Sequence, residues 1–194
     1  MDDETLARAL PGAWTLERWE IRYADGRPPG FPFGEAATGL LLYTPDGWMS
    51  AGIARAARPR FDSPSARHVP AERKCAAFDS YFHYQGRYRI RDGCVLHEVS
   101  DSLNPDFPGS TQLRKAALDG DSLVLSAEDL LPGTTVTREH RLCWRRATGS
   151  GMWASSWCAT IGASVPSKSN ASKGCKAIVA AMRAPPSGEN KCFN

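Results

Sequence analysis

Short runs of alternating hydrophobic and polar residues, separated by tight turns, recur along most of this chain. The segment LLYTPDGWMSAGIAR, residues 41–55, is typical of them. Leu41 and Tyr43 end one run, and Met49 and Ile53 belong to the next. Between the runs, Thr-Pro-Asp-Gly combines a proline that fixes φ with an Asp-Gly pair that accepts positive φ. The segment therefore predicts a β-hairpin.

The chain before this hairpin predicts a short helix and one long strand. DETLARAL carries Leu6 and Leu10 four residues apart and ends at Pro11-Gly12, which is typical of an amphipathic helix. AWTLERWEIRYADG then alternates, but the hydrophobic positions change parity between Leu16 and Trp19. Such a change predicts a β-bulge or a sharp bend in the first strand.

After the hairpin, the pattern predicts one helix and further strands. AERKCAAFDSYFHY places Cys75, Phe78 and Phe82 on one helical face. GRYRIRDGCVLHEVS and TQLRKAALDGDSLVLSA each contain a hairpin about an Asp-Gly turn, and TTVTREHRLCWRRA adds a last strand. About eight strands in meander order favour an all-β, antiparallel up-and-down barrel with an interior for one small ligand. One short helix precedes the barrel, and another lies between strands three and four.

The pattern stops at WRRATGSGMW, which divides the chain into a barrel domain, residues 1–147, and an extension, residues 148–194. The extension is basic and rich in Ser, Ala, Gly and Lys, and it lacks alternation. Its three evenly spaced cysteines (Cys158, Cys175 and Cys192) are compatible with a metal or disulfide device. Without a C-x-x-C pair they favour a flexible extension or an appended artefact instead.

Removing the extension is expected to leave the fold almost unchanged. A chain that ends at Ala147 should melt within a few degrees of the full chain, because residues 148–194 offer little apolar surface to bury. Differential scanning calorimetry of both chains measures this. A large drop in melting temperature in the shorter chain would mean that the extension docks on the barrel.

Charge and hydropathy exclude several classes of partner. The net charge of +3 arises in the extension, which carries +4, whereas residues 1–147 carry −1. Residues 1–147 are nearly neutral overall, so they do not indicate the basic surface that nucleic-acid binding needs. No apolar run approaches the ~20 residues of a membrane span, and the acidic N-terminus lacks the apolar core of a signal peptide. We therefore expect a cytoplasmic protein with reduced thiols and no membrane partner.

Four segments resemble the lipocalin-like domain family. They are LPGAWTLERWEIRYADGR, GLLLYTPDGWMSAGIAR, FDSYFHYQGRYRI and SLNPDFPGSTQLRKAALDGDSLVLS, within residues 7–147. The resemblance implies a small calycin-type β-barrel with a central cavity, of a kind found in bacteria and fungi, sometimes beside natural-product pathways. It implies no settled activity, because such barrels include binding proteins as well as isomerases and cyclases.

His97 is the first candidate site residue. In CVLHEVS it shares a strand face with Val95 and Val99, which is the more apolar face and therefore the inward one. An imidazole there suits a hydrogen bond to a ligand or general-base catalysis, unless a neighbouring strand satisfies it. Burial predicts a pKa below the ordinary value unless a carboxylate such as Glu17 faces the ring.

A second group of candidates follows from TQLR and from the aromatic residues. Gln112 and Arg114 share one strand face, so an inward orientation would offer amide groups and a guanidinium to a ligand, with Glu98 or Glu17 as the counter-charge. An outward orientation would make them an ordinary solvated face. The candidate ligand contacts that complete the set are aromatic: Tyr43, Tyr84, Tyr88 and Trp48.

Other chemistries lack a signature in this sequence. It contains no nucleophile elbow, phosphate-binding loop or dinucleotide fingerprint, so no cofactor is expected. The four histidines are too scattered to predict a metal site. Three cysteines stand in apolar settings and are expected to be buried thiols: Cys75, Cys94 and Cys143.

Two functions stay open. One is a binding protein for a small hydrophobic or aromatic metabolite, and the other is a cofactor-independent cyclase or isomerase of a polyketide-like intermediate, with His97 as its catalytic base. A titratable group within hydrogen-bond range of His97 in the cavity favours the enzyme, whereas an isolated His97 favours the binder. A third idea makes the barrel a mere carrier of the basic extension. A homodimer also stays open.

Overall fold

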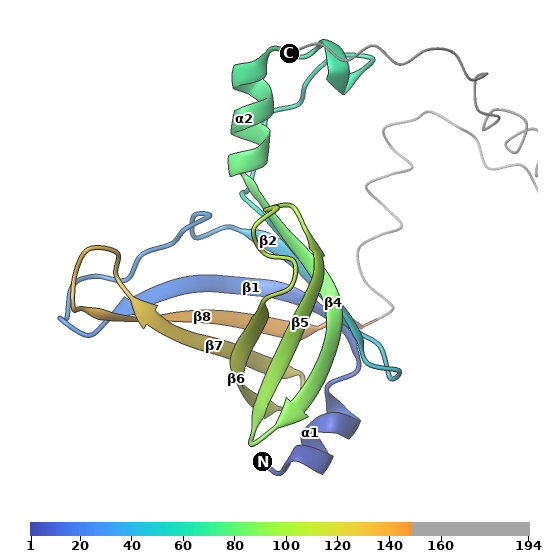
Figure 1. Cartoon of the computed structure of the whole chain (residues 1–194), viewed down its shortest axis with the longest axis vertical. Helices are drawn as coiled ribbons and strands as arrows, with labels where there is room; N and C mark the ends of the chain where they lie inside the picture. Colours follow the sequence, from blue (N-terminus) through green and yellow to red (C-terminus); the bar gives the residue numbers. More distant parts are fainter. Residues whose placement is uncertain (149–194) are drawn as a thin grey trace, which may run out of the picture. The chain divides into compact units, whose positions relative to one another are not determined.

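The computed structural model describes residues 1–148, and within them eight strands form a closed antiparallel barrel in chain order. This confirms the predicted fold, including the meander and the helix between strands three and four (Figure 1). The helices are α1 (Asp3–Ala9), the 3-10 turn η1 (Ala66–His68) and α2 (Ala71–Asp79). The strands are β1 (Gly12–Tyr23), β2 (Thr38–Tyr43), β3 (Trp48–Ala54), β4 (Tyr81–Arg91), β5 (Cys94–Ser102), β6 (Thr111–Asp119), β7 (Ser122–Leu130) and β8 (Thr137–Arg146).

In each of the three predicted Asp-Gly turns the glycine has a positive φ, and in one of them the aspartate does as well. Asp92 and Gly93, between β4 and β5, have φ values of 54° and 70°. Positive φ at both central residues gives a turn whose twist matches that of the flanking strands. The turn fixes the register in which Tyr88 of β4 lies opposite His97 of β5.

The predicted bulge in the first strand is also confirmed. The pairing of β1 with β8 shifts register between Leu16 and Arg18. Beyond this point the side chains of Trp19 and Ile21 point inward, and Trp19 lines the barrel cavity. The parity change in the sequence therefore marks the place where the strand bends around the barrel.

Helix α1 packs under one end of the barrel. Leu6 and Leu10 are fully buried in the core, as their spacing predicts. The indole Nε1 of Trp14 donates to the carbonyl of Leu10, and the Asp3 carboxylate accepts from the backbone N–H groups of the β4–β5 turn. These contacts tie the helix to β1 and to the hairpin that carries His97.

The predicted extent of the second helix is wrong. Helix α2 ends at Asp79, and Phe82 belongs to β4, where it lies opposite Ile53 of β3. This aromatic segment forms a strand in spite of its helical spacing, because aromatic residues pack well on the pleated surface of a sheet. Phe78 remains 49% exposed and Cys75 is exposed, so the prediction of a buried Cys75 thiol is also wrong. Cys94 and Cys143 are half-buried.

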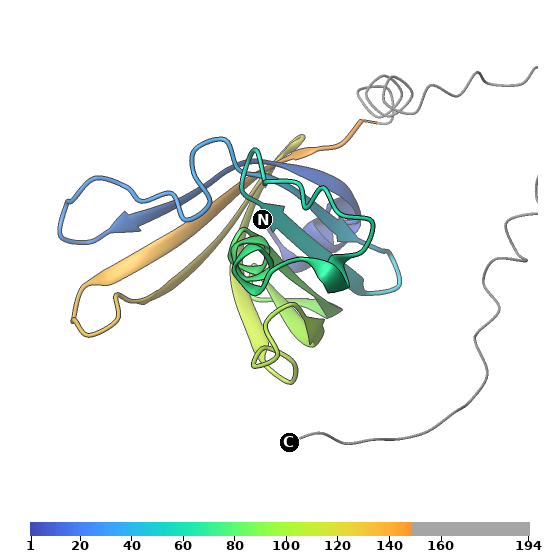
Figure 2. The same ribbon diagram turned by 90° about the horizontal axis from the view of Figure 1, so that it is seen from above.

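The barrel wall separates between β6 and β7. These strands pair only between Lys115–Asp119 and Ser122–Ser126, after which β6 continues beside β5 and β7 beside β8. Figure 1 shows the end of β1 extending together with β8 and β7, away from β5 and β6, and Figure 2 shows the same separation from above. Beyond the Lys115–Ser126 pair, β6 and β7 are therefore not paired with one another, and we call this region the gap.

Within the described residues, no helix is long and apolar enough to cross a membrane. The predicted extension, residues 148–194, lies outside the described residues except for Thr148, and so do its three cysteines.

Candidate functional site

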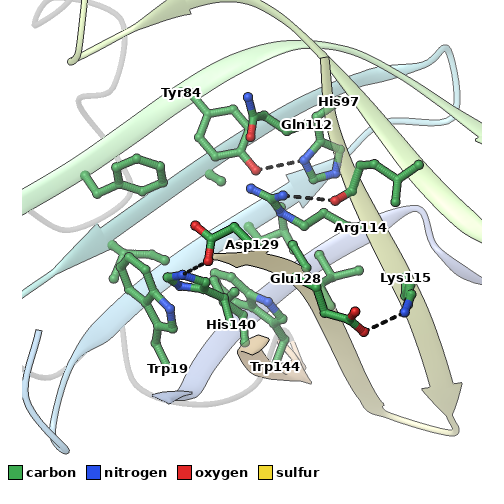
Figure 3. Close-up of a pocket in the computed structure, with 18 of the residues that line it drawn as sticks. Trp19, Tyr84, His97, Gln112, Arg114, Lys115, Glu128, Asp129, His140 and Trp144 are labelled. Carbon is green, nitrogen blue, oxygen red and sulfur yellow. Dashed lines mark hydrogen bonds and ion pairs between the residues drawn. The ribbon is translucent and has the colours of Figure 1, made fainter. Parts of the chain in front are cut away.

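A cavity of about 530 Å³ occupies the barrel interior and reaches the gap between β6 and β7 (Figure 3). Every strand of the barrel contributes to its wall, which combines aromatic and aliphatic side chains with a few polar groups. The aromatic part of the wall is Trp19, Phe82, Tyr84, Phe107 and Trp144. The volume falls in the range of small-molecule sites in proteins.

His97 lies in this wall and is held by two tyrosines. Its side chain is 1% exposed, because β5 turns the Val95, His97 and Val99 face inward, as predicted. The ring Nε2 lies 2.7 Å from the Tyr43 hydroxyl oxygen, and Nδ1 lies 2.8 Å from that of Tyr84. Both ring nitrogens are therefore engaged with protein groups.

Burial governs the protonation of this trio. Removal from water, with a smaller effect of the Arg114 charge, lowers the pKa of His97 from 6.5 to about 3, as its apolar strand face predicts. Burial raises the pKa of Tyr84 and raises that of Tyr43 well above its ordinary value, which Arg114 only partly opposes. All three side chains are neutral at physiological pH.

Gln112 and Arg114 both line the cavity from the inward face of β6. The Gln112 amide nitrogen donates to the Ser110 hydroxyl at 3.0 Å, and one Arg114 guanidinium nitrogen donates to the Leu113 carbonyl at 3.0 Å. Figure 3 shows Arg114 on the same side of the cavity as Tyr84 and His97. The site thus has a positive charge beside its neutral trio.

The predicted counter-charge of Arg114 is wrong. Glu98 is on the outward face of β5 and pairs with Arg89 at 2.6 Å, and Glu17 pairs with Arg145 at 2.9 Å. Alternation along the strand sends Glu98 away from the cavity that His97 faces. Among residues 1–148, no carboxylate oxygen lies within ion-pair distance of Arg114.

The acidic residues of the cavity lie on β7, beside the gap, and have other partners. Asp129 makes two hydrogen bonds to Arg138 and lies 3.5 Å from the His140 ring, and these neighbours lower the pKa of its carboxyl group. Glu128 pairs with Lys115 of β6 at 2.7 Å across the gap. Both carboxylates at the opening are therefore already paired with basic side chains of the protein.

Three of the predicted aromatic contacts are not in the cavity wall. Tyr43 is buried behind His97, and Tyr88 stacks edge-on against Tyr43 while its hydroxyl donates to the Thr44 carbonyl. Trp48 is 47% exposed and stacks with Arg87 on the outer surface. Trp48 points outward because successive residues of a strand face opposite sides of the sheet, and the next residue, Met49, points inward.

Other wall residues were not predicted as site residues. Trp19 and Trp144 line the cavity, and their indole nitrogens are buried without a hydrogen-bond partner among the described residues. Alternation beyond the bulge of β1 is the signal that would have identified Trp19. Alternation is also the signal for His140, which shares a face of β8 with Leu142 and Trp144, and for Asp129, which follows Leu125 and Ala127 on one face of β7.

Two of the three comparisons with known proteins found a match. The profile of the family described as lipocalin-like domain matches residues 11–147. Among curated proteins, a 4'-hydroxy-3'-methoxypropiophenone carrier protein of Aspergillus oryzae is 29% identical over 106 residues, which cover 50% of this chain and 96% of that protein. No solved structure matches the chain at a significant level.

Proposed function

The chain belongs to the lipocalin-like domain family, and we propose that its barrel binds and carries a small aromatic metabolite. The observation that carries this proposal is the cavity, where aromatic rings surround a small number of converging polar groups. This is the general composition of sites that hold small organic molecules, in which apolar contact supplies affinity and polar groups fix orientation. The name of the Aspergillus oryzae relative, a carrier of an aryl ketone, supports the same ligand class.

The state of His97 supports a carrier over an enzyme. Two titratable side chains, those of Tyr43 and Tyr84, lie within hydrogen-bond range of His97, and such proximity by itself would favour an enzyme. A general base, however, needs a free nitrogen and a pKa near the working pH. His97 has a pKa of about 3, and both its nitrogens are occupied by tyrosine hydroxyls. The ring is suited to holding the tyrosines in place.

A direct test uses the two cavity tryptophans as reporters. Titration of the full chain with 4'-hydroxy-3'-methoxypropiophenone should quench tryptophan emission saturably, because an aromatic ligand in the cavity contacts Trp19 and Trp144. Mass spectrometry of small molecules released from the denatured protein should identify an aromatic compound. Absence of both saturable quenching and a released compound would contradict the proposal.

A matched pair of variants locates the binding. Ala127→Phe places a ring in the cavity and should weaken binding about tenfold or more, since the ring takes up volume that the ligand would occupy. Ala117→Phe on the exposed face of β6 should bind like the unmodified chain. Equal affinity in the two variants would place the ligand outside the barrel.

A second candidate function is a cofactor-independent isomerase or cyclase. It is favoured by the position of the Tyr84 hydroxyl in the cavity wall, where it is available to polarise a ligand carbonyl. Incubation of the protein with the compound recovered from it separates the two functions. Recovery of the unchanged compound supports a carrier, whereas protein-dependent conversion supports the enzyme.

A further inference from the structure

The hydrogen bonds around His97 determine which tyrosine keeps a free O–H group. A neutral imidazole has one N–H donor and one bare nitrogen, so it donates to one tyrosine oxygen and accepts from the other hydroxyl. Tyr43 is 2% exposed, and among residues 1–148 the only hydrogen-bond partner of its hydroxyl group is His97. If Tyr43 did not donate to His97, its buried O–H would have no acceptor, which costs free energy.

The proton positions follow from this constraint. Tyr43 donates its O–H to Nε2 of His97, and Nδ1–H donates to the oxygen of Tyr84. The Tyr84 oxygen therefore accepts a hydrogen bond while its own proton remains unused. Because Tyr84 lines the cavity, that O–H group is available to a ligand.

Arg114 supplies the second donor on the same side of the cavity. Figure 3 shows its guanidinium beside Tyr84 and His97, and its charge helps to lower the pKa of His97. Its hydrogen bond to the Leu113 carbonyl uses one of five N–H groups, and within the described part of the chain no carboxylate pairs with it. A cation held in a partly apolar cavity is stabilised by an anionic partner.

The wall holds further donors besides Tyr84 and Arg114. The indole N–H groups of Trp19 and Trp144 add two buried donors that lack partners in the described residues. The acidic residues Glu128 and Asp129 are already paired with Lys115 and Arg138. A ligand that completes these hydrogen bonds must be rich in acceptor oxygen.

We propose that the cavity binds its aromatic ligand as an oxyanion, a phenolate or an enolate, whose oxygen accepts hydrogen bonds from the Tyr84 hydroxyl and the Arg114 guanidinium. This inference rests on the proposed carrier function and names the charge state of the ligand. An acidic phenol or enol that enters from neutral solution loses its proton to the solvent on binding. No covalent bond changes within the ligand apart from that O–H.

The experiment follows the absorption of 4'-hydroxy-3'-methoxypropiophenone, whose phenolate absorbs at longer wavelength than its phenol. In the complex, the phenolate band should appear at least one pH unit below the pH at which the free compound ionises. The O-methyl ether of this compound cannot ionise and should bind at least about tenfold more weakly.

Two substitutions test the donors. Arg114→Met should abolish the phenolate shift and weaken binding about tenfold to a hundredfold, because a hydrogen bond to a charged group is lost. Tyr84→Phe should weaken binding about threefold to tenfold, provided that its circular dichroism matches that of the unmodified chain. The matched control is Arg87→Met, which removes a guanidinium from the outer surface and should leave shift and affinity unchanged.

The outcomes separate the two proposals. If the compound and its ether bind equally, and Arg114→Met leaves affinity unchanged, the cavity is a neutral aromatic site and the oxyanion inference is wrong, while the carrier function stands. If neither compound binds and no aromatic compound is released from the denatured protein, both proposals are wrong.

Discussion

Acidification from pH 6.5 to about 3 is expected to remove about 4 to 5 kcal/mol of folding stability through His97 alone. In the unfolded chain the imidazole takes up a proton near its ordinary pKa of 6.5, whereas the folded protein keeps it neutral down to about pH 3. The unfolded state therefore binds more protons in this window. Stability is fully present above pH 6.5 and falls as the pH falls.

Urea unfolding at a series of pH values between 7.5 and 4.5 measures this effect against a variant. His97→Gln keeps an amide donor and acceptor between Tyr43 and Tyr84 but cannot titrate. Below pH 6.5 the difference in unfolding free energy between the two proteins should change by about 1.4 kcal/mol per pH unit, the value for one proton. Carboxylates titrate in both proteins, so their effect cancels.

The exposed histidine His68 provides the control for this measurement. At pH 7.5 His68→Gln should have the unfolding free energy of the unmodified chain, since the substituted side chain is exposed. Parallel curves for His97→Gln and the unmodified chain would contradict the burial of a neutral His97. They would also remove the basis for the proton positions that leave the Tyr84 O–H free.

The sequence predicts the barrel well because its turns and its alternation are local properties. Asp92-Gly93 and the Thr44–Gly47 turn each determine a hairpin without reference to the rest of the chain. Alternation in β5 then correctly separates inward His97 from outward Glu98. Order and strand number follow from these hairpins, since each strand pairs with the next.

The site is less predictable because it depends on pairing between distant strands. Strand parity alone does not indicate that Tyr43 and Tyr84, from β2 and β4, meet the two nitrogens of one ring. The same limit explains why helical spacing predicts a longer second helix, although pairing with β3 places Phe82 in the sheet. The predicted counter-charge of Arg114 is wrong for a related reason. Glu98 follows inward-facing His97 directly in the sequence, but its side chain faces the outside of the barrel wall.

Gly86 is a position where the chain tolerates no side chain. It is buried in β4, next to the irregular pairing with β5, where Gln85 lies opposite Asp101 and Gly86 opposite Val99. A Cβ atom on Gly86 would lie 2.0 Å from the carbonyl oxygen of Glu98 and 2.9 Å from the backbone nitrogen of Ser100. Both atoms belong to the backbone of the strand that carries His97, so only movement of β5 relieves the clash.

Gly86→Ala should therefore destabilise the protein by about 3 kcal/mol or more, near the upper end for overpacking substitutions, and lower its melting temperature by about 10 °C. Calorimetry measures the loss, and Gly52→Ala on β3 is the matched control. There the new Cβ meets the Tyr81 hydroxyl at 2.7 Å, the end of a side chain that can turn away, so a loss under about 1 kcal/mol is expected. Equal melting temperatures for the two variants would mean that β5 does not run against Gly86. Tyr84 lies two residues before Gly86, and His97 precedes Glu98, so movement of β5 away from Gly86 should disturb the Tyr84–His97 hydrogen bond. Any Gly86→Ala protein that does fold should therefore bind the aromatic ketone more weakly than Gly52→Ala does.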